Sequence, residues 1–350
     1  MKKRIFMCTS VILAVIMCIC VNLKKNTLYD QLVAKRWSPN GGMTQISMFY
    51  PVSENDAITD MTFVDIAHQL QNAVEATAYA DEVSKKDKNG LGFPDATSVT
   101  GKVTISSDKT TLETSAYGVD GDFFIFHPIS LLNGAYLSDD DIMDDEVVLD
   151  EDCAWKLFGS PDISGKTITI GGVPHIVRGV VKKETGKFAE ASGLNGPICF
   201  LSLNSLKKYG YIYGGYNYEV ILPEPVDGFA LKLINEKFST MSEKVLIVEN
   251  SYRFDYRREM DVLFDKGIRS MNTGGMILPY YENIARGYED VFSTVYLWVT
   301  IIVICNLIII SIDIYRFIAS GKLDTIKKQI KHNLIIIIKK QKERRNYEED

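Results

Sequence analysis

Two stretches of the chain carry no charged residue over a length that matches a membrane. They are residues 5–23 and residues 291–312. At 1.5 Å rise per residue, helices of these lengths extend about 28 and about 33 Å, against a hydrocarbon core of about 30 Å. Aromatic residues flank the second stretch, as is typical of a membrane interface: Phe292, Tyr296 and Trp298 before its centre, Tyr315 and Phe317 after it. We predict transmembrane helices at 5–23 and 291–315.

The first stretch has an alternative interpretation as a cleaved signal peptide, because three basic residues, 2–4, precede it. No small-x-small cleavage site follows it. Met17 stands before Cys18, where a lipoprotein signal needs a small residue. An uncleaved anchor is therefore favoured. In the second stretch, Asn306 is either a hydrogen-bonding partner for another helix or a tolerated amide.

Shorter segments of the chain alternate apolar and polar positions, or repeat apolar positions at helical spacing. Alternation predicts strands at 44–50, 99–105, 110–117, 166–170, 175–181, 197–201, 218–222 and 244–249. Helical spacing predicts helices at 61–80, 150–158, 203–209, 225–239 and 254–271. We also expect the first membrane helix to continue to Trp37, because Leu28, Leu32 and Trp37 keep a spacing near four. Gly171-Gly172 predicts a hairpin turn, and 85–92 and 186–197 are expected to be loops.

The predicted strands between 218 and 249 lack sheet partners of their own. The strands predicted between 44 and 105 are their natural partners. This predicts an α+β fold with a discontinuous α+β subdomain, 40–118 plus 213–250, into which a mostly-β subdomain, 119–212, is inserted. Residues 251–290 are predicted to form a stalk that returns the chain to the membrane. The extracellular domain would thus span 24–290.

Charge is distributed unevenly along the chain. Residues 24–290 carry a net charge of −13, residues 1–23 carry +3 and residues 316–350 carry +5. This arrangement is typical of a membrane protein and argues against a nucleic-acid binder. The basic residues after the second span predict that the C-terminus is cytoplasmic. Two spans then place residues 1–4 in the cytoplasm, and the cell membrane is the predicted location.

Beyond the second span, apolar residues recur on one face of a helix, and lysines supply the remaining faces. The apolar positions are Leu323, Ile326, Ile330, Leu334 and Ile337. This pattern predicts that 316–350 is a cytoplasmic, basic amphipathic tail lying on membrane lipid. A helix docked on a cytoplasmic partner and a solvated tail are the alternatives.

Six short motifs follow one another in the middle of the chain. In order they are Asp122-Phe123-Phe124, Leu131–Gly134, Val147–Leu149, Ala154–Gly159, Gly165–Ile170 and Val177–Val180. Their sequence and order resemble the extracytoplasmic core domain of MacB-like, or FtsX-like, ABC transporter permeases. In that family they are a DFF segment, a turn, a strand, a helix end and two further strands. Residues 251–290 resemble the stalk of such permeases from Gram-positive bacteria.

The resemblance implies a non-catalytic permease-like subunit that couples a cytoplasmic ABC ATPase subunit to an extracellular domain handling lipid, peptide or antibiotic. Permease units of that family have four spans, three of them after the extracellular domain, whereas this chain has one there. We expect that a second permease chain or a homodimer completes the unit, that the gene is truncated, or that the protein is a sensor or accessory subunit. The rival hypothesis is a membrane-tethered binding or sensor module without an ATPase partner.

The segment Ser164–Thr167, SGKT, matches the end of a phosphate-binding loop. The full motif needs glycine five positions before Gly165, where the chain has Ser160. A strand is predicted after the segment, whereas a phosphate loop is followed by a helix. We therefore interpret it as a turn and expect no ATP hydrolysis by the chain itself.

The remaining candidates for chemistry are weak. The acidic run 139–146 lacks the alternation and the glycine of a calcium loop, which favours a solvated turn. The histidines are scattered and have no nucleophile or acid at a recognisable spacing: His68, His127, His175 and His332. Cys153 and Cys199 are either one disulfide or, as we favour, two buried thiols. The sequence predicts no catalytic, cofactor-binding or metal-binding residue, no cofactor and no enzyme.

Overall fold

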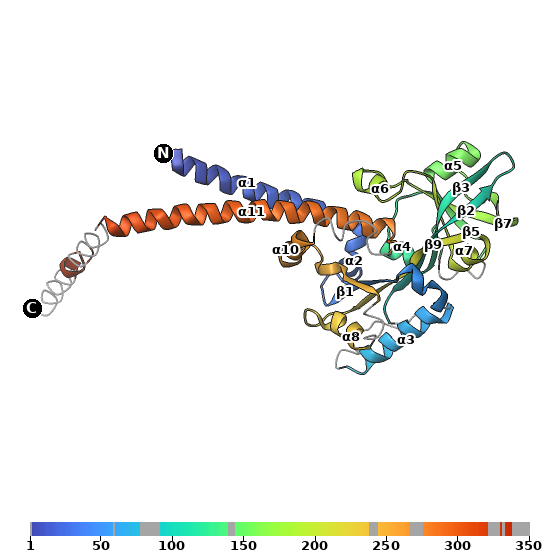
Figure 1. Cartoon of the computed structure of the whole chain (residues 1–350), viewed down its shortest axis with the longest axis horizontal. Helices are drawn as coiled ribbons and strands as arrows, with labels where there is room; N and C mark the ends of the chain where they lie inside the picture. Colours follow the sequence, from blue (N-terminus) through green and yellow to red (C-terminus); the bar gives the residue numbers. More distant parts are fainter. Residues whose placement is uncertain are drawn as a thin grey trace, which may run out of the picture. The chain divides into compact units, whose positions relative to one another are not determined.

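A computed structural model describes residues 2–58, 60–77, 92–138, 144–237, 244–265, 276–320, 330 and 333–337. The chain forms two compact units. One, called the head below, consists of residues 21–294. The other, the membrane unit, consists of residues 1–20 and 295–350. Two helices, α1 (Lys2–Lys25) and α11 (Tyr280–Ala319), each contribute to both units (Figure 1).

Both helices are long and apolar enough to cross a membrane, as predicted. Within the membrane unit, Asn306 Nδ2 donates to Ser10 Oγ at 3.0 Å, so the first of the two interpretations of Asn306 holds. Lys3 Nζ lies 2.5 Å from Asp313 Oδ1. Helix α11 begins eleven residues before the predicted span and continues through it without a break.

The expected continuation of the first helix to Trp37 is wrong. Helix α1 ends at Lys25, and the Thr27 hydroxyl donates to the Lys24 carbonyl at 2.8 Å. Such a side-chain bond competes with the backbone bonds that would extend the helix. A 3₁₀ turn, η1 (Tyr29–Gln31), and a separate short helix, α2 (Val33–Trp37), follow.

The head is built on one mixed sheet in the order β10-β1-β9-β2-β3-β8-β5-β7-β4, with β6 paired to β2 and β7. The strands are β1 (Met43–Phe49), β2 (Asp95–Ser106), β3 (Thr111–Gly121), β4 (Leu131–Gly134), β5 (Glu146–Asp150), β6 (Thr167–Ile170), β7 (Val173–Val181), β8 (Ile198–Ser202), β9 (Tyr211–Pro223) and β10 (Leu246–Glu249). The predicted α+β class is confirmed. Strands from both ends of the head pair with each other, since β1 lies between β9 and β10. The subdomain boundaries, 40–118 plus 213–250, 119–212 and 251–290, stay a prediction.

Strand β9 is much longer than the predicted 218–222, because the Tyr- and Gly-rich residues before it are also extended. Its glycines are required by close backbone approach. A Cβ on Gly215 would lie 1.8 Å from the carbonyl oxygen of Tyr50. The segment Leu131–Gly134 is likewise a strand rather than the expected turn. The hairpin turn at Gly171-Gly172 is confirmed, with φ of 59° and 82°.

Short helices cover the sheet: η2 (Val52–Ala57), α3 (Asp60–Glu75), α4 (Phe123–Phe126), α5 (Glu151–Phe158), α6 (Lys187–Ala191), α7 (Leu203–Tyr209), α8 (Phe229–Lys237), η4 (Asn250–Tyr252) and α10 (Tyr256–Phe264). Helix α7 is confirmed residue for residue; the Ser202 hydroxyl caps it by accepting from Ser205 N at 3.0 Å. Helix α6 lies where the sequence predicts a loop, 186–197. Its five residues are too few to show a helical period.

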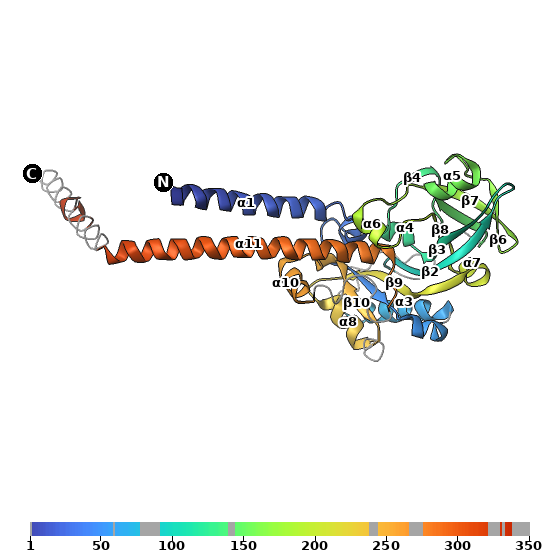
Figure 2. The same cartoon turned by 45° about the horizontal axis from the view of Figure 1, so that its top comes forward.

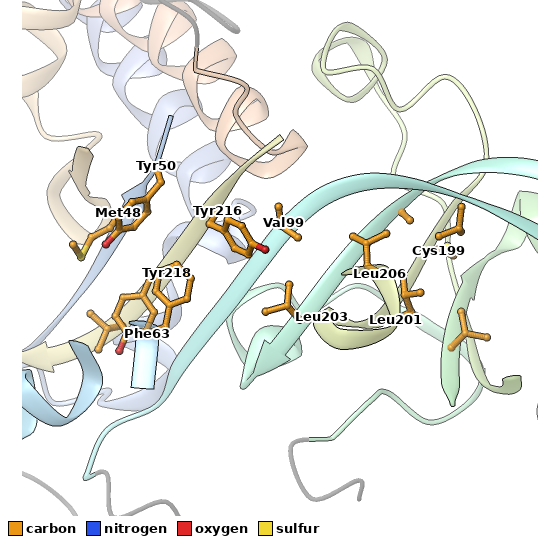
Figure 3. Packing of buried hydrophobic residues seen from close by; sticks show 14 of the residues in the cluster. Met48, Tyr50, Phe63, Val99, Cys199, Leu201, Leu203, Leu206, Tyr216 and Tyr218 are labelled. Atoms are coloured by element: carbon orange, nitrogen blue, oxygen red, sulfur yellow. The ribbon is translucent and has the colours of Figure 1, made fainter. Parts of the chain in front are cut away.

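Two hydrophobic clusters fill the head. Figure 3 shows part of the first, in which Phe63 of α3 stacks on Tyr218 of β9 at 5.5 Å and residues of α7 pack further along the sheet. The second contains Tyr280 and Tyr281, so the first turn of α11 is part of the core of the head. Figure 2 shows α4 and α6 beside this end of α11. The start of α11 is therefore fixed to the head by burial.

Several predictions fall wholly or partly outside the described residues: the helix end at Ala80, the loop at 85–92, acidic residues 139–141, the helix end at Met271, His332 and most of the tail. Both head cysteines are described. Cys153 and Cys199 are buried and free, which confirms the thiol interpretation.

Candidate functional site

Arg253 joins the head to the start of α11. It follows η4 and is only 2% exposed. Its guanidinium meets Glu282 at two points, Nη1 to Oε2 at 2.7 Å and Nη2 to Oε1 at 3.0 Å. Its Nε also donates to Glu289 Oε1 at 2.9 Å. Glu282 and Glu289 are seven residues apart on one helix, so they lie on one face and can share a single guanidinium.

A second arginine completes what we call the charge quartet: Arg253, Glu282, Arg286 and Glu289. Arg286 Nε donates to Glu282 Oε1 at 2.7 Å, one turn along α11. The four side chains carry two charges of each sign, and this balance is what makes their burial tolerable. Burial alone would raise the pKa of Glu282, but Arg253 and Arg286 lower it to about 2. Burial likewise opposes the charge of Arg253, but Glu282 and Glu289 raise its pKa further above the usual range.

Hydrogen bonds extend from the quartet into the sheet. Arg253 Nη1 also contacts Gln31 Oε1 at 2.9 Å and Asn250 Oδ1 at 3.2 Å. Asn250 Nδ2 then donates to Ser47 Oγ of β1 at 2.5 Å. The quartet is thus tied to residues from near the start and near the end of the head, all of them buried.

The same chain of bonds ends at a buried histidine. Ser47 Oγ donates to Glu219 Oε1 at 2.7 Å, and Glu219 Oε2 lies 2.5 Å from His127 Nε2. On the other side, His127 Nδ1 is 3.4 Å from Asp30 Oδ1. Burial alone would lower the pKa of His127, but the carboxylates of Glu219 and Asp30 raise it to about 9. His127 is therefore charged at neutral pH and pairs with Glu219.

Tyr281 connects the histidine back to α11. Its ring stacks on His127 with centroids 3.8 Å apart, and its hydroxyl lies 3.0 Å from Ser98 Oγ of β2. Two consecutive residues of α11, Tyr281 and Glu282, thus engage the two ends of one buried polar network. The hydrogen bonds and ion pairs of this network hold the first turns of α11 against the sheet of the head.

A cavity of about 570 Å³ adjoins the quartet between β10, α10 and α11. Its lining includes apolar residues, among them Leu246, Val248 and Leu278. It also includes three members of the quartet, Arg253, Arg286 and Glu289. The quartet therefore contributes charged groups to the lining of this cavity.

The residues weighed in the sequence are dispersed. His175 of β7 lies 3.4 Å from Ser205 Oγ, far from the network, and Gly165 lies in a turn that enters β6. Of the candidates within the described residues, only His127 belongs to the network. Sequence reasoning missed the quartet, although one signal was available. Glu282, Arg286 and Glu289 recur at helical spacing just before an uncharged span, so they lie on one face of a helix. Charged residues that only face solvent need not share one face.

The mixed α+β head between two apolar helices defines a membrane-anchored protein with a folded domain in its middle. The family described as MacB-like periplasmic core domain matches residues 11–233, and the chain belongs to that family. The resemblance noted in the six motifs is thereby confirmed.

Relatives and solved structures are more distant. The macrolide export ATP-binding/permease proteins MacB of Neisseria gonorrhoeae and Neisseria meningitidis are 33% identical over 93 residues, 26% of this chain but 14% of theirs. The match therefore spans a small part of those relatives. The periplasmic region of MacB from Actinobacillus actinomycetemcomitans is 15% identical, with a TM-score of 0.41 over 60% of this chain and 90% of that one. The extracellular domain of the noncanonic ABC-type transporter YknZ from Gram-positive bacteria is 18% identical, with a TM-score of 0.36 over 58% and 99%.

Proposed function

We propose that the chain is a non-catalytic, permease-like subunit of a MacB/FtsX-type ABC transporter. It crosses the cell membrane twice, with both termini in the cytoplasm and residues 24–290 outside. Membership of the MacB-like family, two apolar helices around the head and the basic residues after the second helix support this proposal. In this arrangement a separate cytoplasmic ABC ATPase subunit supplies the energy.

The observation that carries the proposal is the attachment of α11 to the head. The helix is continuous from Tyr280 to Ala319, and its first turns are held by the charge quartet and by Tyr281. Breaking one partner of a buried ion pair costs about 3–5 kcal/mol. The head and the start of α11 therefore move as one body, which is what transmission of force from the cytoplasm requires. The head then acts on a lipid, a peptide or an antibiotic outside the cell.

The proposal requires partners in the membrane. A second permease chain or a second copy of this chain would complete the permease unit. The test is purification of the tagged full chain in mild detergent, followed by identification of the proteins that accompany it. We expect a nucleotide-hydrolysing subunit. Recovery of the chain alone would contradict the proposal and favour a membrane-tethered binding or sensor module.

The same preparation tests transmission. In reconstituted complexes, Glu282→Gln should uncouple ATP hydrolysis from movement of the head, measured with a fluorescent probe on α5, while leaving assembly intact. Glu236→Gln is the matched control, because its pair with Lys232 spans 3.7 Å on an exposed helix surface. Head movement that persists in Glu282→Gln would contradict the role of the quartet.

A further inference from the structure

Helix α10 presents apolar side chains on the surface of the head. Tyr256, Met260 and Phe264 are spaced four residues apart, which places them along one side of the helix. Leu263 lies beside Phe264, and we call these four residues the α10 stripe. Phe264 is 80% exposed and Tyr256 is 47% exposed, whereas Met260 and Leu263 are half-buried. Single exposed apolar residues are common on protein surfaces, but a continuous stripe marks a surface that meets an apolar partner.

Another side of α10 attaches the helix to the sheet of the head. Glu259 and Val262 are buried. Arg258 Nη1 donates to the carbonyl oxygen of Glu249 at 3.2 Å, and Arg258 Nη2 pairs with the Glu249 carboxylate. These contacts hold α10 beside β10, so the α10 stripe points in a fixed direction. The apolar partner must therefore lie at a fixed place beside the head.

Both uncharged stretches of the chain meet the head next to the start of α10. The ring of Phe254, two residues before the helix, packs edge to face on the ring of Phe292, with centroids 5.3 Å apart. Phe292 is the second residue of the uncharged stretch 291–312. Lys25, the second residue after the uncharged stretch 5–23, donates to the carbonyl oxygen of Phe254. Phe254 thus lies where both stretches leave the membrane.

The start of α10 is close enough to this level to lie among lipid headgroups. Two residues of chain extend at most about 7 Å, which limits the distance from Phe254 to Tyr256. The headgroup layer on each side of the hydrocarbon core is about 5–8 Å thick. Figures 1 and 2 both show α10 beside α11, at the end of the head away from α5. The apolar partner at this place is the membrane surface.

The residues of α10 are distributed as in a helix that lies in a membrane surface. Aromatic side chains such as those of the α10 stripe are typical of the headgroup level. Arg257 is exposed and borders the stripe, seven residues before Phe264, where its long side chain can reach a lipid phosphate. Asp261 and Asp265 are exposed on the side beyond Arg257, away from the stripe. One side of the helix therefore suits lipid and the next suits water.

We propose that α10 lies in the headgroup layer of the outer leaflet, with the α10 stripe inserted towards the acyl chains and Arg257 at the phosphates. The head is then held against the membrane surface by a third element besides α1 and α11. The inference rests on the two membrane helices of the proposed function but not on its ATPase partner, so co-purification and membrane contact can fail separately.

The test is the membrane depth of a nitroxide label on the full chain in phosphatidylcholine nanodiscs that hold one chain each. The background chain has alanine at the exposed cysteines of the membrane helices, whereas Cys153 and Cys199 are buried: Cys8, Cys18, Cys20 and Cys305. Phe264→Cys carries the label on the stripe. Asp261→Cys is the matched control, because it carries the label on the polar side of the same helix.

Oxygen concentrates in lipid and a soluble nickel complex in water, so the two relaxing agents report depth. We expect oxygen to dominate at Phe264→Cys and the nickel complex to dominate at Asp261→Cys. Water contact at both labels would overturn the proposal. Exclusion of both agents from the label at Phe264→Cys would also overturn it, because protein rather than lipid would then cover the stripe. Oxygen dominating at Asp261→Cys would overturn the assignment of the inserted side.

A second variant tests the same contact without a label. Phe264→Trp keeps an aromatic ring on the α10 stripe, and brominated acyl chains should quench the fluorescence that it adds to that of the wild type. Added fluorescence that is not quenched would contradict the proposal. Because Phe264 and Asp261 are exposed, all variants should unfold thermally at the temperature of their parent chain, which confirms that they fold.

Discussion

Arg253 and Glu282 face each other with two parallel hydrogen bonds, 2.7 and 3.0 Å long, and neither side chain is more than 2% exposed. One belongs to the end of the sheet region and the other to the first turn of α11. An arginine that binds a carboxylate at two points fixes orientation as well as distance. The orientation of the first turns of α11 within the head is therefore set by a pair of side chains, and each consequence of that arrangement can be measured.

Removing the negative charge at the centre of the quartet should destabilise the head strongly. In Glu282→Gln, two buried guanidinium groups lose their shared carboxylate, and we expect a loss of about 3–5 kcal/mol in the free energy of unfolding. Chemical unfolding of the full chain in detergent measures this loss. Glu236→Gln, whose partner Lys232 is exposed, should change stability by less than about 0.5 kcal/mol. Similar values for the two variants would refute the structural role of the quartet.

The stability of the head should fall as pH rises above neutral. The pKa of His127 is about 9 in the folded chain and about 6.5 when unfolded, so its contribution is complete below pH 6.5 and is lost between pH 6.5 and 9. The loss amounts to roughly 3 kcal/mol by the same linkage. Unfolding measured at intervals over this window should show the decline in the wild type. A His127→Gln variant should be less stable at pH 6 and show a flatter profile; a parallel decline in both chains would exclude His127 as its source.

Replacing Gly287 of α11 should destabilise the chain because of a contact with Phe188 of α6. A Cβ there would lie 2.4 Å from the Phe188 ring, so Gly287→Ala forces α6 away from α11. We expect destabilisation, although alanine favours a helix by about 1 kcal/mol over glycine. In a Phe188→Ala background the clash disappears, and the same substitution should stabilise the chain. Thermal unfolding of the four chains provides the test, and destabilisation in both backgrounds would contradict the contact.

The amide of Asn306 should contribute modestly to the pairing of the two membrane helices. Asn306→Leu removes its bond to Ser10, and bonds of this kind in membranes contribute about 0.6–2 kcal/mol. Thermal unfolding in detergent should therefore shift down slightly. Ser311→Ala is the control, since the Ser311 hydroxyl bonds to the Leu307 carbonyl of its own helix. A shift in the control as large as that in Asn306→Leu would argue against the interhelical bond.

Local signals in the sequence predicted local structure well. The predicted range of α7, 203–209, matches the structure, where the Ser202 side chain caps its start and Gly210 follows its end. The predicted range of β9 is too short, because its glycines are explained only by distant residues that approach them: Thr100 at Gly214 and the Tyr50 carbonyl at Gly215. The polar network could not be predicted for the same reason. Its residues come from positions as distant as Gln31 and Glu289. The helical spacing of Glu282, Arg286 and Glu289 indicates that they share a face of a helix, but not which residues that face meets.

The bonds of Arg253 to Gln31 and to Glu289 have a consequence for how the protein is made. Gln31 leaves the ribosome early, whereas Glu289 is synthesised only as the second hydrophobic segment begins. The buried network cannot close before that point. Completion of the fold of the head thus waits on synthesis of its last residues, so the domain stays incomplete for most of the time of translation.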